Sequence, residues 1–132
     1  MTLPEEVIHS GRVPRIGPYS QAVRVGNLIF TAGQAGVDPA TGQSAGPTFE
    51  AQARQAFANL RAVLEDSGSG LRRVVKVTCF LADPDAFPKL NELFTEYFPE
   101  SPPARSTPVI SLPKGLLFSI EAIAVVEESQ AI

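Results

Sequence analysis

Residues 117–126 restrict the possible folds of this chain more than any other segment. They read Leu-Phe-Ser-Ile-Glu-Ala-Ile-Ala-Val-Val. Successive side chains of a strand point to opposite faces, so this strand would carry apolar groups on both faces. Both faces of its sheet therefore need cover. Glu121 lies in the middle, where an unpaired carboxylate in apolar surroundings costs several kcal/mol. We therefore expect its carboxylate to pair with a charged or polar group, to contact water, or to take part in the function of the protein.

The remaining sequence predicts further strands and two helices. In the first half of the chain we expect a short strand at residues 7–8, a hairpin over 20–32 that turns at 26–27, and a helix from the N-cap Thr48 to about 67–68. In the second half we expect a strand at 74–82, a helix that Asp85 caps and that runs to 97–98, and two strands joined by a turn at 112–115. The apolar stripe of this second helix consists of Phe87, Leu90, Phe94 and Phe98. This order predicts an α+β fold in which two helices cover one face of a five- to six-stranded sheet. No third helix covers the other face, so we expect a homo-oligomer with Glu121 near a subunit boundary.

Length and charge narrow the class of protein. The chain of 132 residues is expected to form one domain, residues 1–132. No apolar run approaches the roughly 20 residues that span a membrane, and we see no signal peptide, so we expect a cytoplasmic protein that does not bind membranes. Lys and Arg number 11 against 14 Asp and Glu, a net charge of −3, which makes nucleic acid an unlikely partner. A local basic patch of Arg12, Arg15 and Arg24 remains open.

A single cysteine and a single histidine limit the available chemistry. Cys79 alone excludes an intrachain disulfide and a multi-thiolate metal site, and its apolar neighbours predict a buried thiol. A Ser-His-Asp or Cys-His arrangement within one chain would depend on His9. Carboxylates, Arg, Tyr, Lys, backbone groups and water are what remains for catalysis.

Two charged residues of the last two strands, Arg105 and Glu121, stand out. They could form a structural ion pair, or Glu121 could simply face solvent. Alternatively, the guanidinium binds an anion while the carboxylate handles a water or a proton. Two interpretations are also open for Gly33. The glycine could let the backbone come close to a ligand or a neighbouring strand, or it could simply mark a bulge or the end of a strand.

Seven segments along the chain match one known pattern. They are Gly17-Pro18-Tyr19-Ser20-Gln21-Ala22-Val23, Thr31-Ala32-Gly33-Gln34, residues 51–56, Asn59-Leu60, residues 75–78, Pro103-Ala104-Arg105-Ser106 and residues 120–124. Together they resemble the RidA family, also called YjgF or L-PSP endoribonuclease. The resemblance implies a chorismate-mutase-like fold and a homotrimer with three clefts between subunits. It also implies hydrolysis of 2-imino acids and their enamines, such as 2-aminoacrylate and 2-aminocrotonate, to 2-keto acids and ammonia, without metal or organic cofactor.

The same resemblance assigns roles to five residues. Arg105 matches the arginine that binds the substrate carboxylate, for which its planar fork is suited. Glu121 matches the carboxylate that positions the attacking water. Tyr19 matches an aromatic residue that lines the cleft from across the interface, and Gly33 and Asn91 match further cleft positions.

The segment after Arg105 departs from the family pattern. Thr107 occupies a position where many members have Cys, so a thiol nucleophile would not be required, and Thr107 would act on the substrate through its backbone. The segment up to Leu112 is one residue shorter than usual, and Pro108 removes a backbone donor. Because both features change the wall of the cleft, the sequence does not indicate which imino acid is preferred. An RNA-cleaving or RNA-binding protein and a non-catalytic ligand sensor or chaperone are the alternative functions.

Overall fold

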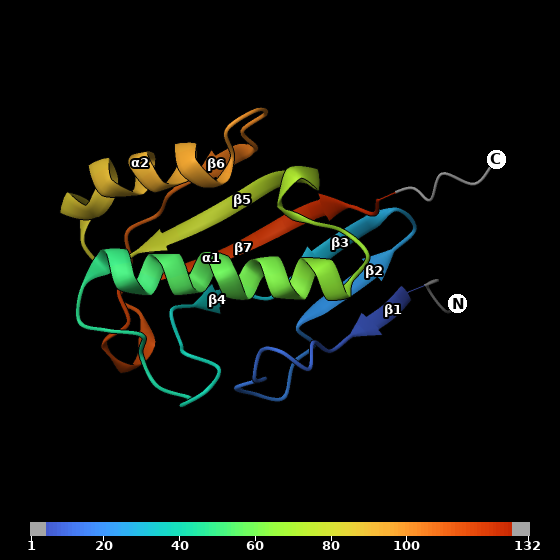
Figure 1. Ribbon diagram of the computed structural model, residues 1–132, viewed down its shortest axis with the longest axis horizontal. Coiled ribbons are helices and arrows are strands. Elements are labelled where there is room, and N and C mark those ends of the chain that lie inside the picture. Colours follow the sequence, from blue (N-terminus) through green and yellow to red (C-terminus); the bar gives the residue numbers. More distant parts are fainter. Residues whose placement is uncertain (1–4, 128–132) are drawn as a thin grey trace.

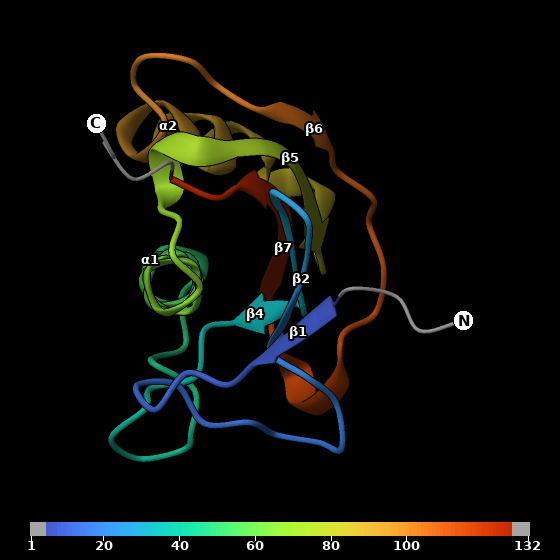
Figure 2. The same cartoon turned by 90° about the vertical axis from the view of Figure 1, so that its right-hand side faces the viewer.

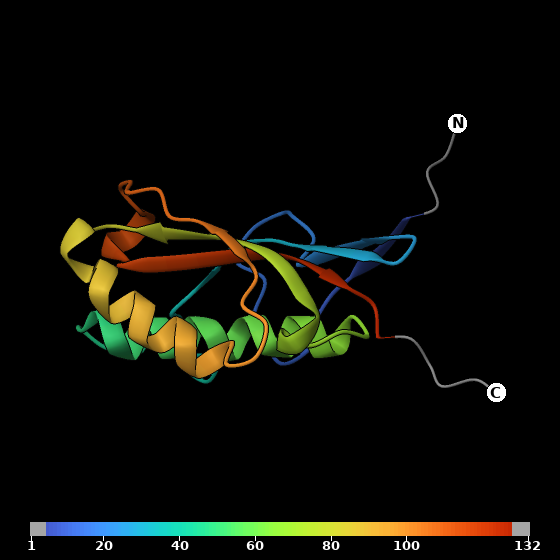
Figure 3. The same ribbon diagram turned by 90° about the horizontal axis from the view of Figure 1, so that it is seen from above.

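Two helices lie on one face of a twisted mixed sheet, as expected for the α+β fold (Figures 1 and 3). The structure is a computed structural model that describes residues 5–127. Its strands and helices are β1 (Glu5–Ile8), β2 (Ala22–Val25), β3 (Leu28–Thr31), β4 (Gln34–Ala35), α1 (Phe49–Asp66), β5 (Val74–Leu81), α2 (Phe87–Tyr97), β6 (Ala104–Ser106) and β7 (Phe118–Val125). Three short 3-10 turns are η1 (Leu71–Arg73), η2 (Pro84–Ala86) and η3 (Pro113–Gly115).

The strands of the described residues form one seven-stranded sheet in the order β1-β2-β3-β7-β5-β6, with β4 also paired to β7. The pairing of β5 with β6 is parallel, and the other pairs are antiparallel. The sheet has one strand more than the sequence suggested, because Gln34 and Ala35, which follow the glycine at 33, pair with Ile120 and Ser119. The predicted hairpin is confirmed, and Gly26 at its turn has a φ of 60°.

The last two strands do not form a hairpin, contrary to the expectation of two strands joined by a turn. β5 lies between them and pairs with both. After Ser106 the chain runs on beside β5, where the carbonyl of Pro108 accepts a hydrogen bond from the backbone N–H of Leu81, and Ile110 donates to the carbonyl of Leu81. The turn η3 then leads the chain around to β7. This non-local pairing places one strand between the two that carry Arg105 and Glu121.

The core fills the space between the helices and the sheet. Phe57 of α1 is fully buried, as predicted, and stacks on Tyr97 with ring centroids 4.3 Å apart. Thr48 caps α1, because its hydroxyl accepts a hydrogen bond from the N–H of Ala51 at 3.2 Å. Val77 of β5 faces these side chains from the sheet and is fully buried.

The start of α2 differs from the prediction in two respects. Asp85 does not cap the helix; instead Asp83 accepts a hydrogen bond from the N–H of Asp85 at 2.9 Å and caps the 3-10 turn η2 that precedes α2. Pro84 follows Asp83 directly as the first residue of this turn, a position at which the missing N–H of proline is no loss. Phe87 was assigned to the apolar stripe but is 45% exposed, because it lies in the first helical turn, and Leu93 takes part in the buried face instead.

The opposite face of the sheet carries no helix in residues 5–127 (Figure 2). Strand register places Val23, Phe30 and Ile123 in one row on this face. Phe30 is 41% exposed, and Val7 and Leu28 are exposed as well. An exposed apolar sheet face of this kind is typical of a protein–protein interface.

The loop before β2 is tied to the end of α1 by a polar network. The Ser10 hydroxyl donates to Asp66 Oδ2, and Arg12 forms an ion pair with Asp66 Oδ1 at 3.0 Å and another with Glu65 at 3.1 Å. The charge of Arg12 is therefore compensated by carboxylates. This pairing argues against the local basic patch that the sequence left open.

This network predicts a pH-dependent contribution to stability. The Ser10 hydrogen bond, and then Arg12, hold the pKa of the Asp66 carboxyl below its ordinary value. The stabilisation is present above the unfolded-state pKa of about 4 and is lost as the pH falls through the lower folded-state value. Asp66→Asn should lower the free energy of unfolding by about 1 kcal/mol at neutral pH, a difference that shrinks in acid.

Urea denaturation at pH 7 and at about pH 2.5 measures this difference. Asp85→Asn serves as the control, because Asp85 is exposed and its carboxylate makes no hydrogen bond or ion pair within the described residues. Equal destabilisation by Asp66→Asn at both pH values would contradict the prediction.

Candidate functional site

Strand β5 divides the predicted site residues into two groups. Residues that register with one another across neighbouring strands point to the same face of a sheet. Arg105 registers with Val77, which is fully buried under the helices. Glu121 registers with Thr78, the next residue of β5, and therefore points to the opposite, helix-free face. One protomer thus presents Arg105 and Glu121 on different faces of its sheet.

Arg105 is held against helix α2 by neutral partners. Its Nη2 donates to Asn91 Oδ1 at 2.7 Å. Its Cζ lies 4.8 Å from the ring centroid of Phe94 and 5.3 Å from that of Phe87. Each cation–π contact is worth about 0.5–1 kcal/mol at an exposed site. We call these four residues (Phe87, Asn91, Phe94 and Arg105) the arginine group.

The arginine group leaves the guanidinium able to bind an anion. Arg105 is only partly buried, and none of its three neighbours in this group supplies a negative charge. A guanidinium has five N–H donors, of which the bond to Asn91 uses one. The group can therefore receive a carboxylate in the bidentate geometry that arginine favours.

Sequence reasoning missed the two rings of this group. The apolar pattern placed Phe87 and Phe94 in the buried stripe of a helix, and only the family resemblance indicated a cleft position for Asn91. Positions 87, 91 and 94 are nevertheless spaced to share one helix face, which was the available signal. What the spacing did not reveal is that β6 would place Arg105 beside that face.

Glu121 is exposed on the helix-free face and forms no ion pair with Arg105 within residues 5–127. The structural ion pair that the sequence left open is therefore absent from the described protomer. Thr78 and Ser106 lie in the same row of the sheet, and Ser106 Oγ accepts a hydrogen bond from Lys76 Nζ at 3.0 Å. Glu121 thus lies at one end of a polar row formed by Ser106, Thr78 and Glu121.

Tyr19 and Gly33 line one cavity of about 680 Å³ on the other side of β5 from Arg105. Ser119 of β7, two residues before Glu121, also lines it. A Cβ at Gly33 would come within 3.0 Å of Ser119 Oγ, so glycine allows this close approach of the chain to β7. At Gly17 a Cβ would lie 2.7 Å from the Tyr19 ring, so that glycine allows the ring to lie over the backbone.

Thr107 directly follows β6 and is partly buried. Beyond it, the carbonyl of Pro108 accepts a hydrogen bond from the N–H of Leu81 at the end of β5. Thr107 therefore lies on the Arg105 side of β5 with Asn91, and away from Tyr19, Gly33 and Glu121.

The described residues offer neither a reactive thiol nor a cluster of metal-binding side chains. Cys79 is fully buried on the helix side of the sheet, and burial raises the pKa of its thiol to about 12, although Arg105 and Lys76 oppose the shift. No cluster of three or more His, Cys, Asp and Glu side chains suited to a metal ion occurs in residues 5–127. Nor is any helix in that range long and apolar enough to cross a membrane.

Comparison with known proteins identifies the family. Residues 10–126 match the family model described as Endoribonuclease L-PSP. The chain belongs to this L-PSP family. It is 48% identical over 122 residues to a RutC family protein of Pyrococcus abyssi, covering 91% of this chain and 96% of that protein. It is 42% identical over 126 residues to the 2-iminobutanoate/2-iminopropanoate deaminase of Bos taurus, covering 94% of this chain and 92% of that protein.

Solved structures of L-PSP relatives agree with the fold described above. The crystal structure of RidA from the Antarctic bacterium Psychrobacter sp. PAMC 21119 matches with a TM-score of 0.87 and 40% sequence identity, covering 92% of this chain and 99% of that chain. The RidA resemblance inferred from the sequence motifs is confirmed.

The buried Cys79 yields a direct prediction. Because a thiol with a pKa of about 12 holds almost no thiolate at neutral pH, the native protein should resist alkylation by iodoacetamide. Intact mass should show no label on the native protein and one label after unfolding in urea. The variant Thr107→Cys, with a partly exposed thiol outside the core, is the positive control for native labelling. Rapid alkylation of native Cys79 would refute the assignment of an inert core thiol.

Proposed function

We propose that the protein hydrolyses small 2-imino acids and their enamine tautomers, such as 2-aminoacrylate and 2-aminocrotonate, to 2-keto acids and ammonia. The arginine group is the observation that carries this proposal, because a guanidinium oriented by neutral partners suits a small carboxylate. The name of the Bos taurus relative, 2-iminobutanoate/2-iminopropanoate deaminase, supports the same reaction.

The proposed active site is shared between protomers of a homotrimer. Arg105 and Glu121 point to opposite faces of their own sheet, so two protomers are needed to bring both to one small substrate. Each of three clefts would combine the arginine group of one protomer with Tyr19, Gly33 and Glu121 of its neighbour. The exposed apolar face around Phe30 supports such an assembly, since it lacks cover within the described chain.

The proposed reaction is a hydrolysis with no change of oxidation state. Protonation of the enamine carbon by solvent gives the N-protonated imine, and water attacks the carbon of its C=N bond. Arg105 holds the substrate carboxylate, and Glu121 orients that water and accepts its proton. Glu121 passes this proton to nitrogen, the C–N bond of the tetrahedral intermediate breaks, and ammonia leaves as the hydroxyl oxygen loses its proton to solvent and the C=O bond forms.

The proposed reaction uses neither a metal nor an organic cofactor, because the protonated imine is already a strong electrophile. Asn91 acts as a positioning residue that orients the guanidinium. Gly33 and Thr107 line the substrate, Thr107 through its backbone. No thiol nucleophile is needed at position 107.

A test of Arg105 distinguishes a clamp from a simple positive charge. Arg105→Lys keeps the positive charge, but a lysine ammonium cannot donate two parallel N–H bonds to a carboxylate or stack flat on an aromatic ring as a planar guanidinium does. Formation of 2-keto acid from freshly generated 2-aminoacrylate should fall on the order of 10²-fold. Arg24→Lys is the matched control, because Arg24 donates only to the nearby carbonyl of Gly26 in the described structure. An unchanged rate in Arg105→Lys would rule out the proposed role.

The proposed homotrimer can be tested by sedimentation. At micromolar concentration the protein should sediment as a trimer, and Phe30→Glu should shift it toward monomer, because burial of that carboxylate at an interface is costly. Ala58→Glu places the same charge on the exposed surface of α1 and should leave the trimer intact. A wild-type protein that sediments as a monomer would contradict an active site shared between protomers.

A further inference from the structure

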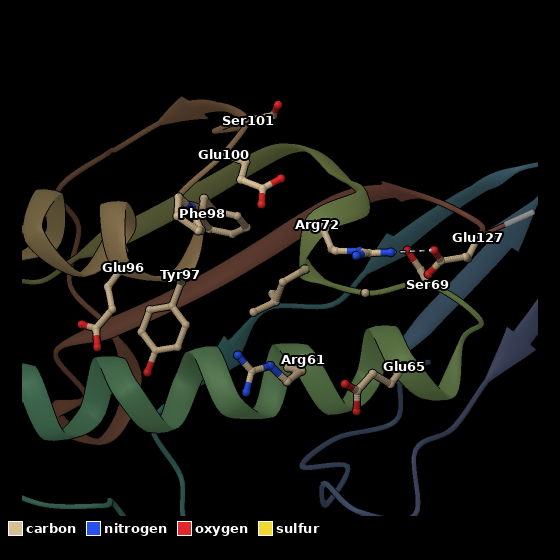
Figure 4. A pocket seen from close by; sticks show the side chains of 13 residues that line it. Arg61, Glu65, Ser69, Arg72, Glu96, Tyr97, Phe98, Glu100, Ser101 and Glu127 are labelled. Atoms are coloured by element: carbon tan, nitrogen blue, oxygen red, sulfur yellow. Dashed lines mark hydrogen bonds and ion pairs between the residues drawn. The ribbon is translucent and has the colours of Figure 1, made fainter.

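A second cavity lies on the helix side of the molecule, away from Glu121 and Tyr19. It encloses about 580 Å³ between the C-terminal halves of α1 and α2 and the turn η1 (Figure 4). This volume lies within the range of small-molecule sites. Leu71 and Phe98, which line it, are 8% and 5% exposed, so part of the wall belongs to the apolar core.

Most of the charges around this cavity are already paired. The ion pairs that take up these charges are Arg72–Glu127 at 3.2 Å, Arg12–Glu65 at 3.1 Å and Arg54–Glu96 at 3.0 Å. The pairing leaves Arg61 and Glu100 as the lining residues whose charge has no ion-pair partner within residues 5–127. Figure 4 shows Arg61 on α1 and Glu100 beside Phe98, both among the residues that line the cavity.

An unpaired cation and an unpaired anion beside an apolar wall match a zwitterion with an apolar side chain. We propose that this cavity binds a free α-amino acid. Its carboxylate pairs with the Arg61 guanidinium, its ammonium group pairs with Glu100, and its side chain lies on Leu71 and Phe98. A polyanion such as a nucleotide would meet the lining carboxylates, and a simple cation would meet two guanidinium groups. This site is independent of the proposed deaminase activity.

The cavity is linked to the arginine group by aromatic contacts. The ring centroid of Phe98 lies 4.7 Å from that of Phe94, which in turn lies 4.8 Å from the Arg105 Cζ. A ligand on Phe98 therefore touches the same aromatic cluster that supports the guanidinium. Backbone amide signals of α2 provide a spectroscopic readout of binding.

The test uses L-leucine as the probe. Calorimetric titration of the full chain should give a Kd of about 1 mM or below. Leucinamide lacks the carboxylate and 4-methylpentanoate lacks the ammonium group, so each should bind at least about tenfold more weakly. Amide shifts in an NMR titration should cluster at residues 61, 70–72 and 97–101. Arg61→Gln and Glu100→Gln should each weaken L-leucine binding about tenfold or more, and Arg24→Gln should not.

Three outcomes would overturn the proposal. They are the absence of L-leucine binding up to about 10 mM, equal binding of all three probes, and binding that Arg61→Gln and Glu100→Gln leave unchanged. A loss of L-leucine binding on Arg105→Ala, with no loss on Arg61→Gln, would place the amino acid at the arginine group and likewise refute the second site. Circular dichroism of each variant confirms that it is folded.

Discussion

The pairing of β5 with both β6 and β7 is the constraint on which the proposed site depends. Because Arg105 registers with Val77 and Glu121 with Thr78, the alternation of a strand directs the two charged groups to opposite faces. A one-residue slip of either pairing would bring them to the same face and would at the same time move buried side chains into solvent. The packing of the core therefore fixes the separation of the two halves of the site.

The partners of Arg105 are as important as its position. A salt bridge to Glu121 would have compensated the guanidinium and oriented it toward its own carboxylate. Contacts with Asn91, Phe87 and Phe94 instead orient it while leaving its charge uncompensated within the group. In the proposed function, an incoming carboxylate would pair with this guanidinium without first breaking an ion pair.

The sequence predicted what is decided locally. The Thr48 cap, the Gly26 turn and the helical periodicity around Phe57 depend on neighbouring residues, and the structure agrees with each. The predicted Asp85 cap was wrong because a 3-10 turn, capped by Asp83, precedes the helix. The two-residue strand β4 and the insertion of β5 between β6 and β7 depend on contacts distant in sequence. The roles of Arg105 and Glu121 came from family resemblance, since spacing alone favoured a structural ion pair or a solvent-facing Glu121.

Subunit mixing tests the shared cleft most directly. Arg105→Ala and Glu121→Gln proteins, each with little deaminase activity, are unfolded together in equal amounts and refolded, with mixed trimers verified by native mass spectrometry. If each cleft takes its arginine and its glutamate from different protomers, about a quarter of the clefts regain both, and about a quarter of wild-type activity returns. Mixed trimers that stay as inactive as their parents would contradict the account, because both groups would then come from the same protomer.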